Sequence, residues 1–141
     1  METYLLDANV VLRFLRRDEP TMSAAADALF ASAERGEVRL VLDSLILAEV
    51  VFVLQSFYKV EREAIADALQ DLINSGGAVE TDRPAVLHDA LERYRRHPQV
   101  DFGDAMLGAL AAEQNLPVAS FDRDLDRFKD VVRFEPPAPV V

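Results

Sequence analysis

Short apolar segments alternate with longer segments of helical periodicity along almost the whole chain. Apolar residues that recur every three or four positions indicate amphipathic helices, and short apolar runs between them indicate strands. A chain that alternates strands with helices folds into parallel strands covered by helices. We therefore expect an α/β protein with a mainly parallel sheet, whose ligands gather at the carboxyl ends of the strands.

The pattern predicts five strands and six long helices. Strands are expected at residues 4–6, 38–42, 78–81, 117–121 and 131–134. Helices are expected at residues 10–17, 22–35, 44–58, 61–74, 83–97 and 101–114, with a short helical turn at 125–128. Ser44 is a candidate cap for the third helix, and Gly76-Gly77 is expected to close the fourth.

Chain length and composition favour one compact domain. The chain has 141 residues, of which 50% are hydrophobic, so residues 1–135 can bury a core as a single domain. Three prolines in residues 136–141 predict a flexible tail. The start of the chain has no basic flank, and no apolar run approaches the roughly 20 residues that span a bilayer, so we expect a cytoplasmic protein.

The chain contains no cysteine, which excludes disulfides and thiolate metal sites. Any metal ion would be held by oxygen atoms or by the two histidines. The net charge of −10 argues against nucleic acid binding, because phosphate contacts normally rest on Lys and Arg. Carboxylates gathered around divalent cations would weaken that objection, since the cations neutralise them.

Two aspartates directly follow predicted strands, where a ligand site is expected. Asp7 follows the first strand and Asp122 follows the strand at 117–121. Each is either a helix N-cap or turn residue, or a metal ligand. Asn9, two residues after Asp7, is a neutral group that could orient its carboxylate.

Two further acids lie in apolar helical surroundings. Glu49 interrupts a segment that is apolar from Leu45 to Leu54, and we expect that helix to be buried. Its acid is expected to face a metal or another acid; the alternatives are a salt bridge to an arginine or a helix rim that reaches solvent. Asp104 precedes an apolar run and is expected to point inward, whereas Asp101 reads as an N-cap and an auxiliary group. Asp124 is expected to be solvated or to contact a second ion.

Such a set of carboxylates suits phosphodiester hydrolysis. Mg²⁺ and Mn²⁺ prefer hard oxygen ligands. Carboxylates packed together repel one another until a cation enters. One or two bound ions can then polarise a phosphate and activate water.

Four motifs, in order, resemble those of PIN domains, and specifically the VapC-type toxin ribonucleases of toxin–antitoxin pairs. They are Leu6-Asp7-Ala8-Asn9-Val10-Val11-Leu12-Arg13-Phe14-Leu15, Ser44 with Glu49, Asp101-Phe102-Gly103-Asp104-Ala105-Met106 with Ala109, and Ala119-Ser120-Phe121-Asp122-Arg123-Asp124. Together they cover residues 3–134. Ala8 stands where the family often has a small polar residue, which leaves the ligand assignments unchanged.

The resemblance implies a three-layer α/β/α fold, cleavage of RNA with Mg²⁺ or Mn²⁺, dimerisation, and inhibition by a cognate antitoxin. It implies that four acids bind the metal: Asp7, Glu49, Asp104 and Asp122. It also implies that Asn9 and Ser120 support them.

Several arginines are candidate RNA contacts. Arg13, Arg17 and Arg95 are expected either to guide the RNA backbone or to form surface ion pairs. Two other function classes stay open at this point. One is a degenerate PIN-fold module that only binds RNA or protein, and the other is a phosphohydrolase or receiver-like domain, which the missing glycine-rich phosphate loop disfavours.

Overall fold

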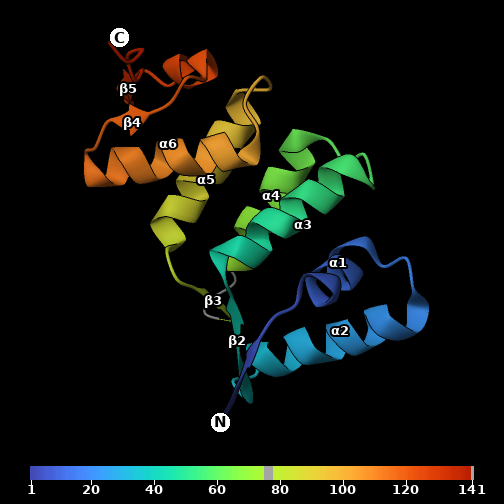
Figure 1. Ribbon diagram of the computed structural model, residues 1–141. Coiled ribbons are helices and arrows are strands. Elements are labelled where there is room, and N and C mark those ends of the chain that lie inside the picture. Colours follow the sequence, from blue (N-terminus) through green and yellow to red (C-terminus); the bar gives the residue numbers. More distant parts are fainter. Residues whose placement is uncertain (75–77, 141) are drawn as a thin grey trace. The chain divides into compact units, whose positions relative to one another are not determined.

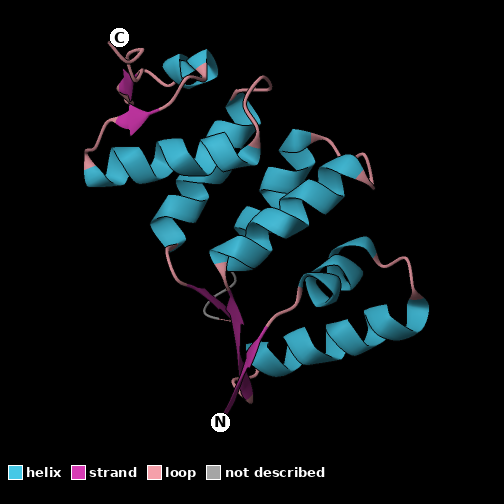
Figure 2. Ribbon diagram, in the orientation of Figure 1, coloured by secondary structure: helices cyan, strands magenta, loops and turns pink. Residues whose placement is uncertain are grey.

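The computed structural model describes residues 1–74 and 78–140 and confirms the α/β class (Figures 1 and 2). Strands and helices alternate as expected, and all strand pairs are parallel. The chain divides into two compact units, Met1–Pro84 and Ala85–Val141, and each is described by itself. The glycine pair at 76–77, expected to close a helix, lies outside the described residues.

The first unit is a three-stranded parallel sheet with four helices. The sheet has the order β1-β2-β3, and Leu5 of β1 lies opposite Val41 of β2. Its strands are β1 (Glu2–Leu5), β2 (Val38–Leu42) and β3 (Val79–Thr81). Its helices are α1 (Ala8–Arg16), α2 (Pro20–Glu34), α3 (Ser44–Ser56) and α4 (Arg62–Ile73).

Apolar faces of these helices and the middle strand form the core of the first unit. Leu40 and Leu42 of β2 are fully buried, as are Leu47 of α3 and Leu69 of α4. Leu40 and Leu42 lie two residues apart on one face of β2, and Leu69 lies one turn after buried Ile65 on α4. The predicted periodicity therefore identified the buried face of α4.

The second unit contains two long helices, a 3₁₀ helix and two short strands. Its elements are α5 (Pro84–Arg96), α6 (Phe102–Gln114), β4 (Val118–Ala119), the 3₁₀ helix η1 (Arg123–Arg127) and β5 (Arg133–Phe134). β4 and β5 pair in parallel as a sheet of their own. Val100, Leu125 and Phe128 are buried together beside them.

A glycine lets the 3₁₀ segment approach α6 closely. A Cβ on Gly108 of α6 would lie 2.7 Å from the ring of Phe128, closer than packed atoms tolerate. Phe128 follows η1 directly and is almost fully buried. The missing side chain at Gly108 therefore makes room for the ring of Phe128 against α6.

Two local expectations are corrected. Asp43, not Ser44, is the N-cap of α3, because its carboxylate accepts a hydrogen bond from the N–H of Leu45 at 2.9 Å. α3 is also not buried on every face, since Leu45 and Phe52 are 76% and 67% exposed. Residues 136–140 lie outside helices and strands, and no helix of the described chain has the length and apolar character needed to cross a bilayer.

Candidate active site

The N-terminal end of α6 places two acids three residues apart. Asp101 is the N-cap, and its carboxylate accepts a hydrogen bond from the N–H of Asp104 at 2.8 Å. Asp104 lies in the first helical turn, where the helix dipole favours negative charge. Its side chain is half-buried, as its apolar sequence neighbours predicted.

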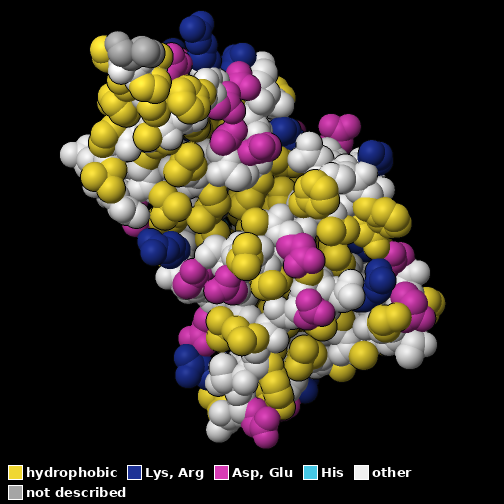
Figure 3. Space-filling model, in the orientation of Figure 1, with side chains coloured by type: hydrophobic (Ala, Val, Ile, Leu, Met, Phe, Trp, Pro, Cys, Tyr) yellow, Lys and Arg dark blue, Asp and Glu magenta, His cyan; other side chains and the backbone are white. Residues whose placement is uncertain are grey.

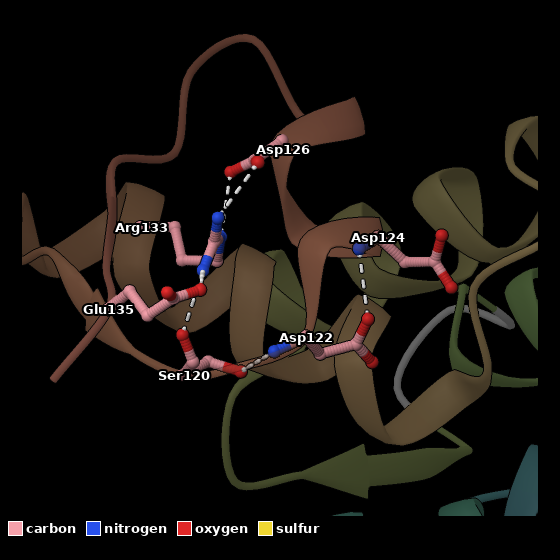
Figure 4. Close-up of polar contacts among 6 residues, drawn as sticks. All are labelled: Ser120, Asp122, Asp124, Asp126, Arg133 and Glu135. Carbon is pink, nitrogen blue, oxygen red and sulfur yellow. Dashed lines mark hydrogen bonds and ion pairs between the residues drawn. The ribbon is translucent and has the colours of Figure 1, made fainter. Parts of the chain in front are cut away.

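The start of η1 contributes two more acids. Asp122 caps η1, and its Oδ1 accepts a hydrogen bond from the N–H of Asp124 at 2.9 Å (Figure 4). The N–H of Asp122 in turn donates to Oγ of Ser120 at 2.9 Å. Ser120 therefore orients the turn that carries Asp122, which is a supporting role like the one expected for it.

An arginine holds the same turn from the other side. Arg133 of β5 donates to the backbone oxygen of Ser120 at 3.0 Å and pairs with Asp126 and Glu135 (Figure 4). The side chain of Arg133 is mostly covered, whereas Asp126 and Glu135 are exposed. This role was not predicted, because Arg133 lies in a segment expected only to be a strand.

Burial and neighbouring negative charges raise the pKa of Asp104 to about 6. Burial is the largest cause, followed by the negative charges of Asp101 and Asp122, a hydrogen bond with Asp122, and the charge of Asp124. Asp and Glu side chains gather beside this end of α6 in the space-filling view (Figure 3). Four acids named from the sequence are therefore electrostatic neighbours within the second unit.

The chemistry of these donors fits a divalent cation. They are oxygen atoms only, and the charges that add to burial in raising the pKa of Asp104 are all negative, so a cation would relieve their repulsion. Across residues 1–74 and 78–140, however, no three acidic or histidine side chains are arranged as a metal site. Asp101 and Asp122 each direct one oxygen to a backbone N–H instead.

The other two predicted ligands belong to the first unit. Asp7 follows β1 and caps α1, and its Oδ1 accepts a hydrogen bond from the N–H of Ala8 at 2.8 Å. In the described chain, no hydrogen bond joins Asn9 to Asp7, so the expected orienting contact is absent there. Glu49 is exposed on α3, which agrees with the alternative of a helix rim that reaches solvent and corrects the argument that burial demands a partner for it.

The sequence matches the PIN domain family over residues 4–131, which is most of the chain. The chain belongs to the PIN domain family. A search of the curated proteins found no match, and neither did a search of the solved structures. The PIN fold is of nuclease type, and its members are generally metal-dependent nucleases.

The arginines expected to contact RNA are engaged in ion pairs of this PIN domain. Arg13 pairs with Asp18 and donates to the hydroxyl of Tyr58. Arg17 forms a bidentate ion pair with Asp27, in which the shorter N–O distance is 2.6 Å. Arg95 pairs with Glu92. The ion-pair alternative describes the observed contacts of all three arginines, and RNA contact by them stays a prediction.

Two acids that follow strands of the PIN domain were not predicted as candidate site residues. Asp43 follows β2 and Asp82 follows β3, so that an acid stands just after each strand of the first unit. Ser44 donates its hydroxyl to both oxygens of Asp82, at 2.6 and 2.9 Å. The rule that picked out Asp7 applies to both residues and would have found them.

Proposed function

We propose that this PIN domain is a cytoplasmic, Mg²⁺- or Mn²⁺-dependent endoribonuclease and the toxin component of a VapBC toxin–antitoxin pair. The observation that carries the proposal is the crowding of carboxylates around Asp104, whose pKa is raised to about 6. In a family of metal-dependent nucleases, such crowding is expected at the residues that hold the ion. The ordered motifs at residues 6–15, 44–49, 101–109 and 119–124 support the narrower VapC assignment.

The metal ligands that we propose are Asp7, Glu49, Asp104 and Asp122. Asn9, Ser120, Asp101 and Asp124 are the proposed supporting residues. Because the family match runs through both compact units, we propose that residues 1–135 act as one nuclease domain.

The bound cation would supply Lewis acidity, which polarises a phosphate and lowers the pKa of a water. The chain's own groups position the carboxylates that would hold the cation. Asp122 adds its charge and a hydrogen bond to the burial that raises the pKa of Asp104, so a cation would be favoured beside these two carboxylates. Ser120 and Asp101 fix the two backbone turns that present these carboxylates.

Cleavage of a fluorescent single-stranded RNA tests the proposal. We expect cleavage with Mg²⁺ or Mn²⁺, no cleavage with a chelator, and loss of cleavage in Asp7→Asn with the fold intact. Asp27→Asn is the matched control, since Asp27 is a surface acid that only pairs with Arg17. If the wild-type protein binds RNA but cleaves it with neither ion, the nuclease proposal is wrong and the degenerate binding module is the better description.

The toxin assignment also implies two protein partners, a second copy of the chain and a small DNA-binding antitoxin. An antitoxin encoded beside this chain should copurify with it and block cleavage. Light scattering of the purified protein measures the dimer. If the protein is a monomer and no neighbouring gene product inhibits it, the toxin assignment is wrong and only the nuclease proposal remains.

A further inference from the structure

The second unit contains a polar pocket that the proposed ligands do not use. It has a volume of about 320 Å³ and lies between the C-terminal half of α5 and the end of η1. We call it the α5 pocket. Its lining comprises Asp89, Glu92, Arg93, Arg96, His97, Arg127, Phe128, Lys129 and Asp130.

The carboxylates of the α5 pocket are already paired. Asp89 and Asp130 both bind Arg93, at 3.1 and 2.5 Å. Glu92 is shared by Arg95 and Arg96, at 3.0 and 3.3 Å. Two positively charged guanidiniums thus share one carboxylate, so the group of three has a net positive charge. Figure 3 shows Lys and Arg side chains gathered over η1, the other wall of the pocket.

His97 reports the sign of the potential in the α5 pocket. Its ring packs edge-on against Phe128, with 5.0 Å between the ring centres. Burial lowers the pKa of His97 first, and the positive charges of Arg93, Arg127 and Arg96 lower it further. These three arginines come from both walls of the pocket, and the carboxylates that also line it are paired with arginines.

We propose that the α5 pocket binds a phosphate group of the RNA strand through Arg96 and Lys129. Arg96 is 73% exposed at its side chain and Lys129 is also exposed, so both can turn toward a ligand. Guanidinium groups match phosphate oxygens with paired hydrogen bonds, and ammonium groups bind them as point charges. The identity of the ligand as RNA rests on the proposed function.

η1 connects this pocket to the crowded carboxylates. Asp122 caps one end of η1, and Arg127 at the other end lines the pocket and pairs with Asp124 at 3.2 Å. A 3₁₀ helix rises about 2.0 Å per residue, so its five residues span roughly 10 Å. One strand can therefore occupy the pocket with one phosphate and reach the acids with another.

Binding of a fluorescent single-stranded RNA, measured by anisotropy in a chelator, tests the site without cleavage. We expect the double variant Arg96→Gln/Lys129→Gln to bind about tenfold more weakly at low salt. The slope of log K against log salt should fall by about 0.7 for each lost contact. Arg35→Gln/Lys59→Gln is the matched control, because it removes the same charges from exposed positions of the first unit.

A second measurement uses His97 and needs no RNA. The chain has two histidines, so a His88→Gln background leaves one imidazole signal to follow by NMR. Inorganic pyrophosphate in the pocket should raise the pKa of His97 by roughly one unit, since an anion favours the charged imidazolium. The double variant Arg96→Gln/Lys129→Gln should abolish that rise, and the control pair should retain it.

The outcomes separate this inference from the proposed function. Pocket-dependent RNA binding by a protein that never cleaves RNA supports the site while the nuclease proposal fails. If the wild-type protein cleaves RNA but the pocket and control variants bind RNA equally well, the phosphate site is wrong and the nuclease proposal stands. Absence of RNA binding overturns the inference. Polyglutamate is a polyanion without phosphate, so pocket-dependent binding of polyglutamate that is tighter than binding of RNA also overturns it.

Discussion

Acids of both compact units cap helices, but they lie in different electrostatic surroundings. In the first unit, Asp7 and Asp43 each follow a strand and cap the next helix, and both are exposed. In the second unit, Asp101 and Asp122 also cap, yet they lie beside half-buried Asp104, where burial first and their charges next raise its pKa to about 6. Capping alone therefore does not show which acid binds a cation; crowding adds that indication for Asp104, and the role of Asp7 stays a proposal.

The largest expected effect separates these two kinds of acid by metal binding. Asp104→Asn should weaken Mn²⁺ binding and RNA cleavage by about a hundredfold or more, because it removes a charge from the crowded set. Asp43→Asn should change neither, since asparagine caps a helix as well as aspartate. Calorimetric titration with Mn²⁺ measures both variants. Equal losses in the two would end the distinction between crowded and capping acids.

The packing that holds η1 against α6 gives the next largest effect. Gly108→Ala places a Cβ 2.7 Å from the buried ring of Phe128, and overpacking of this kind costs about 1–3 kcal/mol of unfolding free energy. Gly103→Ala is the control in the same helix, because its Cβ would meet only a carboxylate oxygen of Asp101, at 3.4 Å. Urea denaturation compares them. A neutral Gly108→Ala would mean that η1 can shift freely.

The charge of Asp104 should make the metal-free protein less stable as the pH rises. The folded state holds this proton more tightly than the unfolded chain, whose pKa is near 3.8. Stability is therefore fully present below pH 4 and is lost as the pH rises through about 6. Asp104→Asn should gain about 1 kcal/mol at pH 7.5 in a chelator, a value reduced for the partial exposure of the group.

Capping acids of the first unit should show the opposite sign. Asp43→Ala removes a hydrogen bond to the N–H of Leu45 and should lose about 1 kcal/mol under the same conditions. Thermal unfolding in a chelator at pH 4 and 7.5 measures both substitutions. If Asp104→Asn also destabilised the protein at pH 7.5, the crowding described here would be wrong.

The smallest expected effect concerns Glu49. Glu49→Gln should change the unfolding free energy by less than about 0.5 kcal/mol, because the side chain is exposed. Val50→Ala, the next residue on α3, should cost about 1–3 kcal/mol, since Val50 is fully buried. A large loss in Glu49→Gln would restore the buried-acid interpretation of α3.

Element type was predictable from sequence almost throughout. The apolar period identified the six helices and the strands that the described chain contains, and the cap of α6 was predicted at Asp101. The start of α5 was predicted one or two residues before Pro84, where the helix begins. Predictions about exposure were less successful. α3 is apolar from Leu45 to Leu54 except at Glu49, and this composition carries no periodic signal to show which face meets the core.

Local patterns of apolar, capping and glycine residues determined by themselves which segments become helices and strands, because those preferences act over one or two turns of chain. They also named the acids at residues 101, 104, 122 and 124. Only the tertiary structure decided that these four interact, that Arg133 anchors their turn, and that Arg96, His97 and Arg127 share one pocket. Those relations depend on Coulomb and packing forces between residues distant in sequence, and no local pattern encodes such distances.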